Sequence, residues 1–312
     1  MKFILPVLIL LFLFLLPLFA GTYLLHLMIL IFLYAYLGQS WNVLGGYAGQ
    51  LSLGHATFLG LGAYTSTLLF IHLGVTPWLG MFVGAILAAL CGVIIGFMSF
   101  HFGLKSHFFA LATIAFAEIF RLFATSFQAV GGAQGLLIPL KGNDLYALQF
   151  VEKDPFYYIA LIMVILCTGI VYLLQRSKFG FYFVAIRENE EAAKALGINT
   201  LRYKVLATGI SAFLTALGGS FYAQYVLYID PHGTFGVLNS VDIALRTIIG
   251  GTGTLLGPIV GSFVLSPLSE MIQTLIGVGR GGVYMMVYGA ILMIVCIVMP
   301  NGVFPYIKRL WK

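Results

Sequence analysis

Charged side chains are scarce in this chain, and the spacing of some of them suggests specific chemistry. The sequence holds only 16 Lys and Arg and 10 Asp and Glu among 312 residues. Glu118 and Arg121 are three residues apart and Asp242 and Arg246 are four apart, so each pair can meet on one helix face. Such a pair is either a structural ion pair that orients a helix or a binding site in which the acid and the base contact the two charges of a zwitterionic substrate. The spacing leaves both interpretations open, and in either case the face that carries Glu118 and Arg121 should point into the bundle.

A further polar group lies in a glycine-rich stretch between two apolar runs. Gln50, Ser52 and His55 are interspersed there with Gly49 and Gly54. At membrane depth, irregular backbone is tolerated only where it is buried in protein or lines a cavity. These three polar residues are therefore candidates for a pathway or gate, and a tight helix–helix contact enabled by the glycines is an equal alternative.

Metal and covalent chemistry are not indicated. Cys91, Cys167 and Cys296 each lie inside an apolar run, and the histidines lack metal-ligand spacing. The sequence contains no G-x-x-x-x-G-K-[ST], so it carries no P-loop of its own. We expect no metal, no cofactor and no enzymatic activity, and any ATPase would be a separate chain.

The largest group of charges is an island in an otherwise apolar chain. Nine charged residues fall between positions 176 and 204: Arg176, Lys178, Arg187, Glu188, Glu190, Glu191, Lys194, Arg202 and Lys204. We expect the region of about 175–204 to be a water-facing loop that a soluble partner can grip. The net charge of +6 does not indicate nucleic-acid binding, because the basic residues lie at the ends of apolar runs.

The elements that position these residues are membrane-spanning helices. A composition of 61% apolar and 8% charged residues excludes an ordinary soluble domain. Long continuous apolar runs favour helices over a β-barrel. We predict one all-α polytopic membrane domain over 1–312 with about ten helices, from the runs 3–20, 23–44, 55–72, 78–100, 107–127, 156–174, 205–229, 236–249, 254–277 and 282–300. The eighth run is short and is expected to be tilted, broken or re-entrant, and the first is expected to be retained rather than cleaved.

Topology follows from the distribution of basic residues. With the N-terminus inside, 11 of the 16 Lys and Arg residues fall on inside connections or termini. The positive-inside rule then places both termini in the cytoplasm, after ten crossings. A long connection of about 128–155, punctuated by glycine and proline, falls outside. It is a candidate functional loop, and a plain extracellular loop is an equal alternative.

Within the island, the segment from Arg187 to Gly197 has the marks of one short helix. Asn189 or a neighbour can cap its start, and Gly197 supplies a left-handed stop. Glu190 and Lys194 are spaced for an i,i+4 pair. A helix this short is marginal alone, because isolated helices need roughly 12–15 residues in water. It therefore needs a partner surface, which the small side chains of Ala192, Ala193 and Ala195 would let approach.

Four motifs in this order resemble one family. They are GQLSLGHA at 49–56, FALAT at 109–113, AIRENEEAAKALGI at 185–198 and IGGTGTLLGP at 249–258. Together they resemble the permease of high-affinity branched-chain amino-acid ABC importers, over roughly 38–302. Glu191, Ala192, Ala193 and Gly197 match the EAA-x-x-x-G loop of ABC-importer permeases, whereas the I-x-L-P that follows it in the fuller pattern is missing here.

The resemblance implies a type II importer fold in the bacterial inner membrane with a cytoplasmic coupling helix. In that family the helix contacts the ATPase, which here implicates Arg187, Glu188, Glu190, Glu191, Ala192, Ala193 and Gly197. The implied partners are two P-loop ATPase subunits, a second homologous permease and an extracytoplasmic binding protein. The implied substrate is a branched-chain or other hydrophobic amino acid, carried across the lipid bilayer.

Rival functions belong to other classes. An ion-gradient-driven secondary transporter would use Glu118, Asp242 and Glu270 to bind protons or Na⁺. Related ABC permeases also move urea or short amides. An integral-membrane enzyme has no motif in its favour.

Overall fold

Helices make up most of the computed structural model, which describes residues 4–276 and a few positions between 286 and 306. The helices before the island are α1 (Ile4–Leu15), α2 (Thr22–Trp41), α3 (His55–Leu73), α4 (Pro77–His101), α5 (Ser106–Ser126) and α6 (Asp154–Arg176). Those in and after it are α7 (Lys178–Glu188), α8 (Glu190–Ala195), α9 (Thr200–Val226), α10 (Pro231–Phe235), α11 (Val237–Gly251) and α12 (Gly257–Ile276).

The remaining elements are short. A 3-10 turn, η1 (Leu16–Leu18), follows α1, and a π-helical turn, η2 (Asn42–Tyr47), extends α2. Two more 3-10 turns, η3 (Gln128–Val130) and η4 (Gly132–Gln134), lead into β1 (Leu136–Leu137). This strand pairs antiparallel with β2 (Tyr228–Ile229), with Leu136 opposite Ile229.

Six described helices are long and apolar enough to cross a membrane: Thr22–Tyr47, His55–Leu73, Pro77–His101, Ser106–Ser126, Asp154–Arg176 and Thr200–Val226. They correspond to the second through seventh apolar runs. The first run contains only the 12-residue α1 and the η1 turn. The tenth run, 282–300, falls largely outside the described residues, so the count of ten helices stays a prediction.

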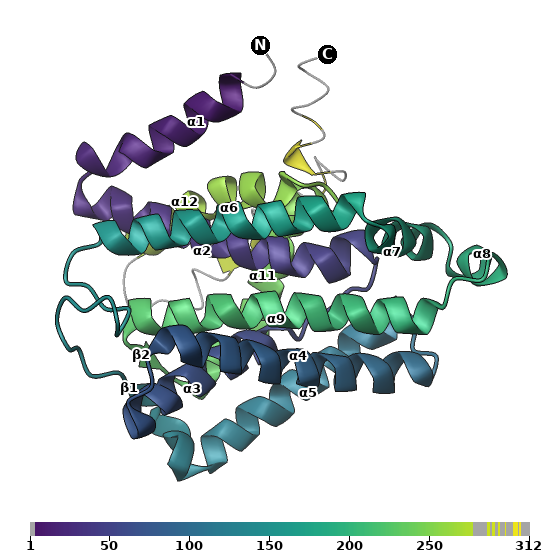
Figure 1. The fold of residues 1–312 in the computed structure, drawn as a ribbon, viewed down its shortest axis with the longest axis horizontal. Helices are drawn as coiled ribbons and strands as arrows, with labels where there is room; N and C mark the ends of the chain where they lie inside the picture. The colour runs from purple at the N-terminus through teal and green to yellow at the C-terminus, as the bar shows by residue number, and fades with distance from the viewer. Residues whose placement is uncertain are drawn as a thin grey trace.

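The long helices lie side by side, and the two ends of the bundle carry different structures (Figure 1). At one end, α7 and α8 project past the other helices. At the opposite end, β1 and β2 form a short ribbon. We call these the α8 end and the ribbon end. The expected loop of 128–155 lies at the ribbon end and contains η3, η4 and β1.

The eighth apolar run, expected at 236–249, is a broken segment. After β2 at the ribbon end, α10 is followed directly by the 15-residue α11. The backbone N–H of Ala56, in the first turn of α3, donates to Ser240 Oγ near the start of α11 at 2.8 Å. Just past the end of α11, the N–H of Gly253 donates to Asn42 Oδ1 at 2.9 Å. The chain thus passes from the ribbon end to the α8 end without a single continuous helix.

Small residues set the packing of α3, α4 and α9 at the centre of the bundle. A methyl group at Gly62 on α3 would lie 2.0 Å from the carbonyl oxygen of Ala216 on α9. One at Gly219 on α9 would lie 2.0 Å from the carbonyl oxygen of Leu59. Membrane helices approach closely where such residues face each other, because backbones then touch directly. This close packing holds the polar residues of α3 and α9 away from lipid.

Candidate functional site

The expected short helix of the charged island is present, but it begins later than predicted. A break at Asn189 divides the segment, so Arg187 and Glu188 end α7 and do not belong to α8. The Asn189 side chain accepts a hydrogen bond from the N–H of Ala192 at 3.0 Å, which confirms the predicted cap. Because Asn189 is extended (φ −159°, ψ 104°), one helix from Arg187 to Gly197 is excluded.

The predicted stop at Gly197 is also confirmed. Gly197 has φ of 84°, a left-handed conformation that side chains disfavour. The N–H of Gly197 donates to the carbonyl of Lys194, and that of Ile198 donates to the carbonyl of Ala193. These two bonds form a Schellman motif that satisfies the last carbonyls of α8.

A buried ion pair anchors α8 to the bundle. Lys204 on α9 is 6% exposed, and its Nζ lies 2.8 and 3.0 Å from the carboxylate oxygens of Glu190. The ammonium also lies 4.6 Å from the centre of the Phe100 ring on α4. The hydroxyl of Thr200 donates to Glu190 at 3.1 Å. Partial burial raises the pKa of Glu190, but the hydrogen bond and charge of Lys204 outweigh it and keep this pKa below its usual value.

The residues of α8 face in two directions. Ala193 is 2% exposed and packs toward the protein, so the expectation that it offers a surface to a partner is wrong. Its place on the inner face follows from the anchoring of Glu190 three residues earlier. Outward lie Glu191, with 84% of its side chain exposed, and Leu196, which is 81% exposed. Lys194 bridges both acids, at 3.4 Å from Glu190 and 3.1 Å from Glu191.

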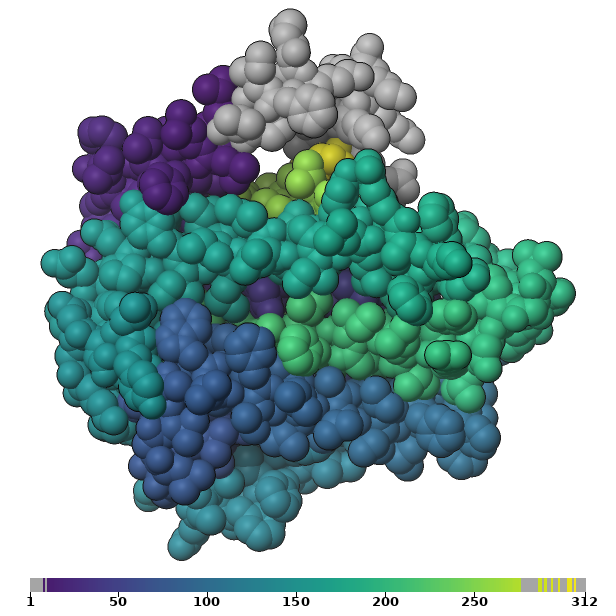
Figure 2. Space-filling model, viewed as in Figure 1, coloured from purple at the N-terminus to yellow at the C-terminus, as the bar shows by residue number. Residues whose placement is uncertain are grey.

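The exposed side of α8 forms a tip at one end of the molecule (Figure 2). Beside it is a shallow depression of about 400 Å³ that Tyr182, Leu196, Arg202 and Tyr203 help to line. Sequence reasoning missed Leu196 as a surface residue. Leucine is common throughout this sequence, so only the exposure seen in the structure marks Leu196 as part of an interaction surface.

The glycine-rich stretch with Gln50, Ser52 and His55 is deeply buried. His55 and Ser52 are fully buried and Gln50 is 6% exposed. His55 bridges two hydroxyl groups, with Nδ1 2.9 Å from Ser52 Oγ and Nε2 2.7 Å from Ser211 Oγ on α9. Gln50 donates to the carbonyl of Ala48 at 3.0 Å. These contacts favour the interpretation as a helix–helix contact over a pathway lining.

The same stretch packs against α5 through residues of the FALAT motif. Thr113 Oγ1 accepts from the N–H of Leu53 at 3.1 Å, and a methyl at Gly54 would lie 2.3 Å from the Thr113 carbonyl oxygen. Ser106 accepts from the N–H of Leu51 at 3.0 Å. Two motifs that are 60 residues apart in sequence thus build one contact.

Glu118 and Arg121 form the expected ion pair on α5, but not inside the bundle. Arg121 Nε donates to Glu118 Oε2 at 2.8 Å, and Nη1 lies 3.2 Å from His232 Nε2 on α10. The Glu118 side chain is 44% exposed and that of Arg121 is 17% exposed. The expectation that this face points into the bundle is therefore wrong for a single chain, because α5 lies at the edge and its polar face is only partly covered, by His232 on α10.

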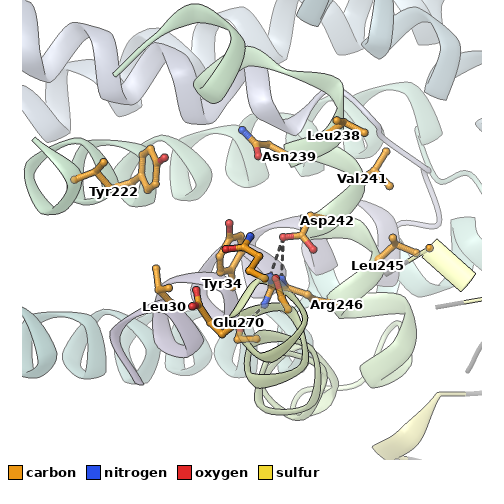
Figure 3. A pocket seen from close by; sticks show the side chains of 15 residues that line it. Leu30, Tyr34, Tyr222, Leu238, Asn239, Val241, Asp242, Leu245, Arg246 and Glu270 are labelled. Carbon is orange, nitrogen blue, oxygen red and sulfur yellow. Dashed lines mark hydrogen bonds and ion pairs between the residues drawn. The ribbon is translucent and has the colours of Figure 1, made fainter. Parts of the chain in front are cut away.

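Asp242 and Arg246 form the wall of a cavity of about 550 Å³ between α2, α9, α11 and α12 (Figure 3). Arg246 is 2% exposed, donates to Asp242 Oδ2 at 2.8 Å and stacks 3.6 Å from the ring centre of Tyr34. It also donates to Ser266. The guanidinium is thus enclosed by the protein. Glu270, the third acid that an ion-driven transporter would use, lines this cavity too.

No group of three or more His, Cys, Asp or Glu residues that could hold a metal ion occurs within the described part of the chain. Several of its charged groups meet as carboxylate–cation pairs, among them those at α8, on α5 and beside the cavity. Such pairs can orient helices and transmit motion.

Comparisons with known proteins agree on one family. The family model described as "Branched-chain amino acid transport system / permease component" matches residues 23–296. The chain is 25% identical over 296 residues to the high-affinity branched-chain amino acid transport system permease protein LivM of Escherichia coli (strain K12), covering 88% of this chain and 68% of that protein. The LivM protein of Salmonella typhimurium gives the same values.

A second group of relatives is named for a different substrate. The autoinducer 2 import system permease protein LsrC of Yersinia pestis (strain Pestoides F) is 26% identical over 186 residues, covering 55% of this chain and 52% of that protein. No solved structure matches the chain significantly.

Proposed function

Because the chain belongs to the family of permease components of branched-chain amino acid transport systems, we propose that it is the membrane-spanning subunit of an ATP-driven importer. The chain is an integral membrane protein of a transport family, and it carries no P-loop motif. Energy for transport therefore comes from two separate P-loop ATPase subunits. Its fold class in this proposal is the type II importer permease, in the bacterial inner membrane with both termini in the cytoplasm.

The single observation that carries the proposal is the construction of α8. The helix is capped at both ends, anchored by Glu190 to Lys204, and turned outward at Glu191 and Leu196. A six-residue helix held this firmly at the tip of a bundle presents a rigid surface to a soluble partner. We assign the ATPase contact to the outward set of Glu191, Ala192, Ala195 and Leu196.

The other residues implicated by the resemblance then hold α8 in place. Glu190 and Ala193 face the bundle, and Gly197 ends the helix. Glu188 is exposed beside Arg187, at the junction between α7 and α8. This division predicts that replacements in the two sets give different defects: loss of the ATPase for the outward set, and a misplaced α8 for the inward set.

The edge of the bundle supports a second permease subunit. Charged groups within a membrane face a bundle interior or a water-filled cavity, because exposure to lipid is costly. Glu118 on α5 is 44% exposed in the single chain. A homologous permease beside α5 would cover this face and enclose a polar path between the two subunits. An extracytoplasmic binding protein would then deliver substrate at the ribbon end.

In the proposed cycle, ATP binding draws the two ATPases together and moves α8 with them. The permease pair switches from outward to inward access, because the ATP-bound ATPases favour one of its two conformations. The proposed substrate is a branched-chain or other hydrophobic amino acid, as the names of the LivM relatives suggest. The LsrC relatives indicate that permeases with related sequences serve other solutes, so uptake of urea and short amides is tested alongside.

The decisive experiment is co-purification of the tagged chain from gently solubilised membranes, followed by mass spectrometry. We expect P-loop ATPases and a second permease with the native chain. Combined replacement Glu191→Arg and Leu196→Asp should reduce the recovered ATPase at least tenfold. Glu152→Arg, the same charge reversal on an exposed residue at the ribbon end, is the matched control and should change nothing.

Uptake in membrane vesicles then separates the rival functions. An ATP-driven importer loses uptake of labelled leucine when ATP is depleted and retains it when an ionophore collapses ion gradients. The reverse pattern, from a chain that purifies without ATPases, would establish the ion-driven transporter instead. Uptake of urea but not leucine would keep the ATPase proposal and change the substrate.

A further inference from the structure

Arg187, the first residue of the RENE motif, has a side chain that reaches away from α8 and toward the bundle. It lies in the last turn of α7, two residues before the break at Asn189. Its Nη1 donates to the carbonyl of Gly46 at 3.0 Å, a contact across 141 residues of sequence. Its side chain is 34% exposed, so it sits at the surface of the bundle rather than within it.

The carbonyl that Arg187 binds belongs to one of two glycine turns that meet at the α8 end. The first turn covers 45–49, at the end of η2, and the second covers 250–253, at the end of α11. Asn42 joins them: its Oδ1 accepts from the N–H of Gly253 at 2.9 Å, and its Nδ2 donates to the carbonyl of Thr254 at 2.9 Å. Through these two bonds, Asn42 at the start of η2 connects the segment that contains the first turn to the second turn.

The Arg187 side chain fits between the two turns because both have glycine where they contact it. A methyl group at Gly253 would lie 2.4 Å from Nη1 of Arg187, and one at Gly49 would lie 2.6 Å from its Cγ. Gly49 also has φ of 69°, which disfavours any replacement. The arginine thus touches the first turn along its stem and the second turn at its tip.

We infer that Arg187 is a positioning residue that links the docking helix to both glycine turns, rather than a contact to the ATPase. The inference rests on the proposed function, because it assigns Arg187 the task of passing the motion of α8 to α2 and α11. A shift of the α7–α8 junction pulls on the Gly46 carbonyl, and Asn42 carries the shift to the second turn. Both α3 and α12, which follow the turns, then receive the motion from one side chain.

The chemistry of arginine suits this link better than that of lysine. Its planar fork lets Nη1 hold the Gly46 carbonyl while Nε and Nη2 hold Glu188 Oε1, at 3.1 and 2.6 Å. Glu188 keeps the guanidinium in the orientation that faces the turns. A lysine ammonium on a flexible stem has no fixed fork to serve both partners.

The test uses the full complex in proteoliposomes with three variants: Arg187→Ala, Arg187→Lys and Lys178→Ala. Lys178→Ala removes the same charge from an exposed residue of the same helix and is the matched control. Three quantities are measured: ATPase recovered with the permease, leucine uptake, and the stimulation of ATP hydrolysis by loaded binding protein.

We expect Arg187→Ala to keep its ATPase within twofold of the native amount while uptake falls at least tenfold and stimulation is abolished. Arg187→Lys should restore part of both activities, since one donor can reach Gly46. Loss of the ATPase from Arg187→Ala with retention in the control would make Arg187 a docking residue and overturn the inference. Unchanged uptake and stimulation would also overturn it.

Two further results, loss of the Arg187→Ala protein and absence of ATPase from the native chain, also have a definite meaning. If Arg187→Ala is not recovered from membranes, Arg187→Lys is judged by the same three measurements, and full native coupling in that variant contradicts the need for the fork. If the native chain recovers no ATPase at all, the proposed function fails first and the inference fails with it. If only the inference fails, the native chain still recovers its ATPase. If the proposed function fails, it does not, so the two failures are distinguishable.

Discussion

Neighbouring acids at the start of α8 have opposite surroundings. Glu190 is 32% exposed and pairs with the buried Lys204, whereas Glu191 is 84% exposed and pairs only with Lys194 on the surface. Removing Glu190 leaves a buried ammonium without its carboxylate, which is costly. Removing Glu191 loses a solvated bridge, whose contribution is usually about 0–1 kcal/mol.

We therefore predict different effects of Glu190→Gln and Glu191→Gln on the order of α8. A spin label at Ala195→Cys, read by electron paramagnetic resonance, should be rigid in the native chain and in Glu191→Gln at pH 7. Glu190→Gln should favour the detached helix by about 2 kcal/mol, roughly 30-fold in population. The label should then be mobile, and equal mobility in all three chains would refute the anchor.

The pH dependence of the same label has a definite sign. Since the pKa of Glu190 lies below its usual value of 4.5, its contribution to stability is present at neutral pH. That contribution is lost as the pH falls below 4.5 and through the lowered pKa. The native label should become mobile in this window, and Glu190→Gln should show no such transition.

At the residue scale, sequence could predict local contacts and not distant ones. Asn189 and Gly197 were assigned correctly because a cap and a stop act within a few positions. The same is true of the i,i+4 pair of Glu190 with Lys194. Lys204 was not identified as the stronger partner of Glu190, because 14 residues and a turn separate them. The seat of Arg187 depends on two turns far apart in sequence and was equally out of reach.

At the element scale, the bundle depends on positions where a side chain would not fit. Gly219 on α9 faces the carbonyl oxygen of Leu59, with no space for a methyl group. Gly169 on α6 has no neighbouring atom within 4 Å of the same position. Both glycines lie in helix interiors, so they differ in packing rather than in backbone conformation.

This contrast predicts opposite results for two identical substitutions. Gly219→Ala forces α3 and α9 apart and should destabilise the protein by about 2 kcal/mol, as overpacking does. Gly169→Ala should stabilise it by about 0.5–1 kcal/mol, because alanine is the better helix former. Thermal unfolding in detergent, followed by intrinsic fluorescence, compares them. Equal shifts in midpoint would show that the close approach at Gly219 does not govern packing.

Continuous apolar runs predicted the long helices correctly, whereas the sequence did not predict where α7 and α8 separate. Runs two to seven each became a helix, because lipid requires every backbone group to be satisfied within the helix. The separation of α7 from α8 turned on the extended conformation of Asn189, which no periodicity reports. The exposure of Glu118 likewise depends on where α5 lies in the bundle, and that follows from tertiary packing.

At the scale of the whole molecule, the proposed topology places the two ends of the bundle on opposite sides of the membrane. The α8 end carries most of the charged island, and the ribbon end carries the connection of about 128–155. The positive-inside rule assigns the α8 end to the cytoplasm.

Labelling with a membrane-impermeant maleimide tests this orientation in a cysteine-free background. Leu145→Cys, 66% exposed near the ribbon end, should react in intact spheroplasts and be protected in inverted vesicles. Ala195→Cys on α8 should give the opposite result. Reaction of both positions from the same side would contradict the proposed topology and the location of the ATPases.

Because α9 is long, a movement applied at Lys204 near its start would be enlarged at its other end. A helix of 27 residues is about 40 Å long, nearly a membrane in thickness. Lys204 ties α8 to its first turns, and its last turn leads directly into the β1–β2 ribbon. If α9 pivots as a rigid rod, a tilt of roughly 5° imposed at α8 displaces the far end by ~3.5 Å. In the proposed complex, one lever arm would thus convert a small rotation at the α8 end into a larger movement at the ribbon end.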